Sequence, residues 1–122
     1  MMALNPGDLL YIFCIFRDPP DYKYVVCTRP RFPLFFLVNS QPRRTSPDAQ
    51  ILIKRSDFPF LKYDSYIDVS KMVTFGREEI EKAEWKGSLT PSLIQEIREI
   101  VRKTDYLPPH HKQIVFENFP FP

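Results

Sequence analysis

Short apolar runs, separated by polar segments that contain proline, are the main pattern along the chain. Residues 35–38 (Phe-Phe-Leu-Val) form the clearest run, which ends in Asn39 and Ser40. A run this short is typical of a strand rather than a helix, and its aromatic and branched side chains favour the same choice. Because no polar residue interrupts the run, we expect a strand that is buried on both faces.

Similar runs predict further strands through the first half of the chain. We expect strands over residues 9–16, 24–27, 35–38, 51–55 and 64–69, because the prolines between them cannot lie inside central strands. Residues 41–50 are the most polar segment and predict a loop. Residues 56–61 bend at a proline, and we expect their apolar side chains to cover an open end of a barrel.

The spacing of apolar residues changes after Gly76. Residues 78–85 predict a short charged helix or turn. Thr90 and Pro91 suit the N-cap and the first position of a helix, and we expect that helix to end near Lys103. Its apolar residues follow the one-sided spacing of an amphipathic helix: Leu93, Ile94, Ile97, Ile100 and Val101. Residues 110–119 are predicted to add a last strand.

The order of these elements predicts a mainly β fold with α, namely a small half-open β-barrel with a C-terminal helix packed on it. We expect residues 1–107 to form the barrel and its helix, and residues 108–122 to form a C-terminal extension. A length of 122 residues agrees with one domain, and 43% hydrophobic residues can supply its core.

The net charge of +2 is too small to indicate a nucleic-acid partner by itself. The local distribution is more informative, because Arg29, Arg31, Arg43 and Arg44 fall in or beside predicted loops. Such a basic region is compatible with phosphate binding, and a solvated loop explains it equally well.

The cysteines and histidines indicate neither a disulfide nor a metal site. Cys14 and Cys27 both lie in apolar runs, so we expect buried, reduced thiols. His110 and His111 are adjacent on a predicted strand, where they would point to opposite faces and make poor co-ligands. We expect no metal and no cofactor. Without a recognisable signal peptide or membrane span, a cytoplasmic protein is expected.

Five short segments, taken in order, resemble a known family. They are residues 6–10 (PGDLL), 23–26 (KYVV), 36–40 (FLVNS), 64–68 (DSYID) and 86–89 (KGSL). Their order over residues 6–103 resembles the PemK/MazF family of toxin endoribonucleases. The resemblance implies an SH3-like barrel with a C-terminal helix, a homodimer, single-stranded RNA as the substrate, and a small acidic antitoxin protein as a partner.

The resemblance also implies a site. In that family, an arginine just before strand two and a threonine at the end of strand three promote attack of an RNA 2′-hydroxyl on the next phosphate, without a metal. These positions hold Lys23 and Ser40 here, which are therefore the candidate catalytic residues. Lysine keeps the charge but lacks the planar fork of a guanidinium. Candidate RNA-binding residues are Arg17, Arg29, Arg31, Arg43 and Arg44.

The expected function is that of an endoribonuclease toxin of a toxin–antitoxin pair, cutting single-stranded RNA without a metal. The family's first loop, which contains glycine and glutamine, is replaced here by Asp-Pro-Pro-Asp at residues 18–21. This replacement favours the alternative of a non-catalytic SH3-like module that binds RNA or a protein. An unrelated small barrel with a structural role is a third possibility. For Lys23 and Ser40, the alternatives are a solvated edge lysine and a strand-end turn residue.

Overall fold

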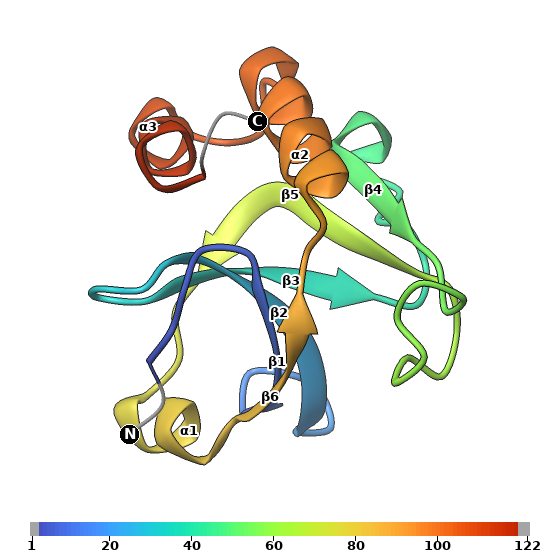
Figure 1. Ribbon diagram of the computed structural model, residues 1–122, viewed down its shortest axis with the longest axis vertical. Helices are drawn as coiled ribbons and strands as arrows, with labels where there is room; N and C mark the ends of the chain where they lie inside the picture. Colours follow the sequence, from blue (N-terminus) through green and yellow to red (C-terminus); the bar gives the residue numbers. More distant parts are fainter. Residues whose placement is uncertain (1–2, 120–122) are drawn as a thin grey trace.

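A curled six-stranded antiparallel sheet forms the body of the protein, which a computed structural model describes over residues 3–119 (Figure 1). The strand order is β4-β5-β3-β2-β1-β6, which leaves β4 and β6 at the two edges. The strands are β1 Asp8–Cys14, β2 Asp21–Arg29, β3 Leu34–Asn39, β4 Gln50–Ile53, β5 Ser65–Val73 and β6 Glu84–Ser88. The predicted mainly β fold, a half-open barrel with a C-terminal helix, is confirmed.

Both faces of the central strands are buried, which explains why their sequences show so little alternation. One face carries Leu9, Val26 and Phe36 into a large core cluster that also receives side chains from the C-terminal helices. The opposite face carries Leu10, Val25, Phe35 and their neighbours into a second cluster. The expectation that residues 35–38 form a strand buried on both faces is confirmed, since all four side chains are buried.

Helices cover the sheet from two ends of the molecule (Figure 1). The short helix α1 (Arg77–Lys82) lies at one end, where Ile80 and the following Ala83 pack on the second cluster. Helix α2 (Pro91–Lys103) lies at the other end with its apolar side chains in the first cluster. Its predicted start and end are confirmed, because Thr90 accepts a hydrogen bond from the Leu93 amide and the helix stops at Lys103.

The prediction of a last strand over residues 110–119 is wrong. These residues belong mainly to helix α3 (Pro109–Asn118), which starts at a proline and packs on α2. Pro109 is pre-set for the first helical turn, and Val115 and Phe119, four residues apart, reach the same core cluster. Helical spacing therefore explains this segment better than strand alternation does.

The prediction for residues 78–85 is half right. Helix α1 ends at Lys82, and Glu84–Ser88 then form the edge strand β6, which pairs with β1. The β6 segment is short and charged, so its own sequence carries no strand signal, and pairing with β1 decides its conformation. Strand β1 is also shorter than expected, because Ile15 and Phe16 lie beyond its end and are exposed.

Both cysteines are buried free thiols, as predicted. Burial raises the pKa of Cys27 to about 12, with a smaller contribution from the charge of Asp8. A thiol with so high a pKa carries almost no thiolate at neutral pH, so Cys27 serves as a small core side chain and not as a nucleophile.

Candidate functional site

A pocket of about 480 Å³ opens where β2 begins and β3 ends. We call it the tyrosine pocket. Its lining includes four tyrosines (Tyr11, Tyr22, Tyr24 and Tyr63), three cationic side chains (Arg17, Lys23 and Lys62), and the polar residues Asn39 and Ser40. Among residues 3–119, no carboxylate and no imidazole lines it. The pocket therefore combines positive charge with aromatic surface.

Strand pairing builds the aromatic wall of this pocket. Tyr11 lies opposite Tyr24, and Tyr22 lies two residues before Tyr24 on the same face of β2. The ring of Tyr11 stacks on that of Tyr22 with 5.0 Å between centroids and approaches that of Tyr24 at 4.7 Å. The Tyr24 hydroxyl donates a hydrogen bond to the Phe60 carbonyl at 3.0 Å. These contacts orient the rings toward one another along the wall of the pocket.

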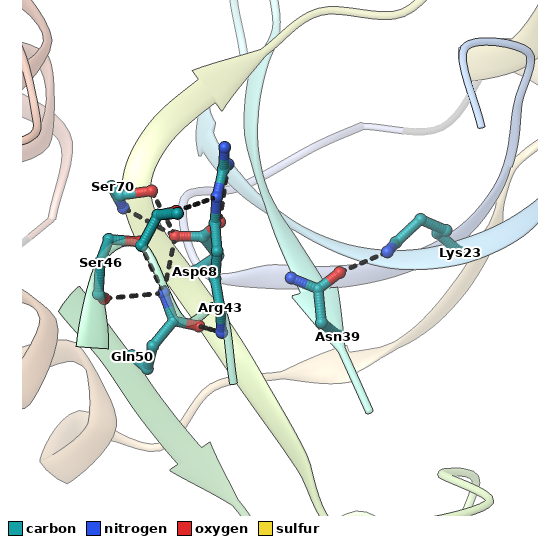
Figure 2. Close-up of polar contacts among 8 residues, drawn as sticks. Lys23, Asn39, Arg43, Ser46, Gln50, Asp68 and Ser70 are labelled. Atoms are coloured by element: carbon teal, nitrogen blue, oxygen red, sulfur yellow. Dashed lines mark hydrogen bonds and ion pairs between the residues drawn. The ribbon is translucent and has the colours of Figure 1, made fainter. Parts of the chain in front are cut away.

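Lys23 lines the pocket from β2, on the face of that strand opposite the rings of Tyr22 and Tyr24, and is anchored by β3. Tyr24 pairs with Val38, so the next residues outward, Lys23 and Asn39, lie side by side. The Lys23 ammonium donates a hydrogen bond to Asn39 Oδ1 (Figure 2). Burial lowers the pKa of Lys23 below its ordinary value, and the positive charge of Arg17 lowers it further.

Ser40 lines the same pocket as Lys23, one residue beyond the end of β3. Its side chain is exposed, and the side chain that contacts Lys23 is Asn39. Asn39 was expected only to end the run over residues 35–38 and was not named as a site residue, although pairing residues 24–27 with residues 35–38 in antiparallel register would have placed it beside Lys23. Alternation along β1 and β2 would likewise have grouped the tyrosines.

The five predicted RNA-binding arginines lie in three different places. Arg17 lines the tyrosine pocket and is held by the Tyr22 carbonyl at 3.4 Å and by Asp21 at 3.9 Å. Arg29 and Arg31 lie at the far end of β2, about 20 Å along the strand from Lys23. There Arg29 donates to the Phe32 carbonyl and Arg31 lies over the Phe32 ring.

The remaining two arginines, Arg43 and Arg44, lie in the loop between β3 and β4, and both are exposed. The Arg43 guanidinium faces Asp68 at 3.6 Å. Of the seven predicted site residues, the structure thus brings Lys23, Ser40 and Arg17 together in one pocket. A role in catalysis or RNA binding stays a prediction for all seven.

Asp68 is the centre of a buried polar network beneath the loop that carries Arg43 (Figure 2). Its side chain is 1% exposed. One carboxylate oxygen accepts hydrogen bonds from Gln50 Nε2 at 3.0 Å, from the Ser70 amide at 3.0 Å and from the Ser70 hydroxyl at 2.6 Å. The other faces Arg43. Both oxygens of this carboxylate thus have partners among the described residues.

The two adjacent histidines lie on helix α3, with 4.3 Å between their ring centroids, so the expectation that they point to opposite faces of a strand is wrong. Across residues 3–119, no group of three or more histidine, cysteine or acidic side chains is arranged to hold a metal ion. Burial lowers the pKa of His111, and the neighbouring His110 and Arg29 lower it further.

The lowered pKa of Lys23 gives a testable pH dependence. The folded protein loses the Lys23 proton at a lower pH than the unfolded chain, whose lysines titrate near 10.5. Keeping this ammonium charged in the folded protein lowers the free energy of unfolding. That loss of stability is fully present below the folded-state pKa of Lys23 and disappears as the pH rises toward 10.5. A titration of the lysine side chains by NMR should give Lys23 a midpoint below 10.5, and Arg17→Gln should raise that midpoint. A midpoint at or above 10.5 would contradict the assignment.

Comparison with known proteins finds no family model that matches this chain and no curated protein whose sequence matches it. Within the part of the chain that the structure describes, no helix has both the length and the apolar character needed to cross a membrane.

Proposed function

We propose that this protein is an endoribonuclease that cuts single-stranded RNA without a metal, with the tyrosine pocket as its site. The observation that supports this proposal most directly is that Lys23 and Ser40 line the same pocket as Arg17 and the stacked tyrosines. Cationic side chains attract phosphates, and aromatic rings stack on unpaired bases. A duplex hides the faces of its bases, so this combination favours a single strand.

The proposed reaction is an internal transfer at one phosphate. The 2′-hydroxyl oxygen bonds to the adjacent phosphorus, the bond from phosphorus to the 5′-oxygen breaks, and the products carry a 2′,3′-cyclic phosphate and a 5′-hydroxyl. The 2′-hydroxyl proton passes to water, the departing oxygen takes a proton from the Lys23 ammonium, and the Lys23 amine then regains a proton from water. The lowered pKa of Lys23 makes it a better acid than an ordinary lysine. Arg17 and the Ser40 hydroxyl stabilise charge on the phosphate oxygens.

A second candidate function is binding of single-stranded RNA without cleavage. The specific observation that favours it is the absence of any carboxylate or imidazole from the lining of the tyrosine pocket, so water alone takes the first proton. Arg17 is the guanidinium that lines this pocket, and it forms an ion pair with Asp21 of the loop at residues 18–21. This ion pair competes with a phosphate for the guanidinium. Both functions use the same pocket and differ only in the chemical step.

The wider role follows from the family resemblance. We propose that the protein acts in the cytoplasm as the toxin of a toxin–antitoxin pair, as a homodimer. A small acidic antitoxin would suit a pocket that carries three cationic side chains and no carboxylate of its own.

A cleavage assay in excess chelator tests the proposal. The purified protein is mixed with a labelled single-stranded RNA, and the products are separated and their ends identified. Fragments that end in a 2′,3′-cyclic phosphate support the enzyme. Binding by fluorescence anisotropy without fragments supports the second candidate. If the protein neither binds nor cuts the RNA, both candidate functions are contradicted. A substrate with 2′-O-methyl groups serves as the control, because it has no attacking hydroxyl.

A further inference from the structure

A second, smaller pocket of about 250 Å³ lies beside the Asp68 network. Its lining residues are Arg43, Thr45, Ser46, Ser70, Lys71 and Tyr106, so two cations and four hydroxyls face one hollow. Pockets for larger ligands begin at roughly 300 Å³, which makes this one suited to a small polar group. Of its lining residues, only Arg43 was among the candidate RNA-binding residues, and the proposed reaction gives the pocket no role.

The hydrogen bonds around this pocket leave donors available to an anion. The Arg43 side chain donates through Nε to Thr45 Oγ1 at 3.0 Å and faces Asp68, which orients the guanidinium and leaves N–H groups for a ligand. Thr45 accepts that bond, so its own hydroxyl proton remains free to be donated. Ser46 likewise accepts from Gln50 at 3.3 Å. The Asp68 carboxylate lies beneath the pocket and is already occupied by protein donors.

Lys71 adds a second positive charge to the same pocket from an exposed position on β5, two residues before the strand ends. No carboxylate of residues 3–119 forms an ion pair with it. A pocket that presents a fixed guanidinium, an ammonium and hydroxyl donors, and no carboxylate in its lining, has the chemistry of a phosphate site.

The position of this pocket connects it to the tyrosine pocket. Gln41 lines the tyrosine pocket and Arg43 lines the smaller one. These residues are two positions apart, so the distance between their Cα atoms is at most about 7 Å. The charges of Asp68 and Lys71 also reach Lys23, since Asp68 raises the pKa of its ammonium and Lys71 lowers it. A single strand of RNA carries one phosphate per nucleotide, so a strand seated in one pocket brings a nearby phosphate to the other.

We propose that the smaller pocket binds a backbone phosphate of the RNA strand whose neighbouring nucleotide occupies the tyrosine pocket. That the ligand is RNA rests on the proposed function. That the pocket suits a phosphate rests only on the side chains that line it. It predicts that the protein reads the length of an RNA strand, because a mononucleotide reaches one pocket and an oligonucleotide reaches both.

The test uses the full-length protein and three variants, Lys71→Gln, Thr45→Val and Lys54→Gln. Lys54 is an exposed lysine that lines none of the pockets described, so Lys54→Gln is the matched control. Two ligands are titrated by fluorescence anisotropy and NMR. One is a 2′-O-methyl uridine hexamer, which has no 2′-hydroxyl to attack the phosphate and therefore stays intact, and the other is uridine monophosphate. Lys71→Gln should weaken hexamer binding about fivefold and reduce the slope of log affinity against log salt by about 0.7. Thr45→Val should weaken hexamer binding in the same direction.

Uridine monophosphate affinity should be unchanged in both variants, and Lys54→Gln should leave every affinity unchanged. Inorganic phosphate, followed by NMR, should shift the amide signals of Thr45 and Lys71 in the unsubstituted protein. If phosphate shifts these signals while the hexamer fails to bind at all, the pocket takes free phosphate, and the RNA assignment and the proposed function are overturned. If the hexamer binds equally well to all variants and phosphate shifts nothing, this inference is overturned while the proposed function stands.

Discussion

Replacing Lys23 with alanine is expected to slow metal-free RNA cleavage at least about 100-fold, because the proposed reaction loses its proton donor and its nearest ammonium. Lys23 lies at the wall of the tyrosine pocket, where its ammonium is held by Asn39. Fragment yield over time in excess chelator gives the rate. Because the side chain is only partly buried, the thermal unfolding midpoint should change little, which separates a lost step from a lost fold.

Asn39→Ala provides the contrast within the same contact. It keeps the Lys23 ammonium and removes its anchor, so we expect a smaller loss of rate than in Lys23→Ala and a changed pH dependence of cleavage. Lys54→Ala removes a lysine outside the pocket and should leave the rate unchanged. If Lys23→Ala cuts RNA as fast as the unsubstituted protein, Lys23 takes no part in the reaction and the proposed mechanism is wrong.

The elements that sequence patterns predicted well are those whose own residues decide their structure. Residues 35–38 have no polar positions, and Thr90 with Pro91 fixes the start of α2, so both were predictable. The edge strand β6 was not, because its charged residues become a strand only through pairing with β1. Helix α3 was missed because Ile114, Val115 and Phe116 have high β-propensity, while its burial on α2 depends on tertiary contacts.

The candidate site shows the same division. Lys23 and Ser40 were found through a resemblance in the order of short segments, and Arg17 was named among the candidate RNA-binding residues. Asn39 and the tyrosines act across strands, and their grouping depends on register, which a single sequence specifies only weakly. The smaller pocket is harder still to predict, because Tyr106 reaches it from beyond α2 and Lys71 reaches it from β5.

Asp68→Ala is expected to have the largest effect on stability of the changes considered. The carboxylate is 1% exposed; without it the amide and hydroxyl of Ser70 would lose their acceptor in a buried site, and Gln50 would keep only its bonds to Ser46. Removing one partner from a buried charged network costs about 3–5 kcal/mol. For a domain of this size, the unfolding midpoint should fall by roughly 10–20 °C.

Comparison with Asp68→Asn separates the loss of charge from the loss of shape. Asparagine fills the same space and keeps one acceptor for Ser70, so its cost in unfolding free energy should be smaller than that of alanine. Asp48→Ala, at an exposed position on the 3-10 helix Pro47–Ala49, should shift the unfolding free energy by at most about 0.5 kcal/mol. Urea titrations of the three variants measure these differences. If Asp68→Ala unfolds like Asp48→Ala, the network under Arg43 does not hold β4 and β5 together, and the smaller pocket above it has no rigid base.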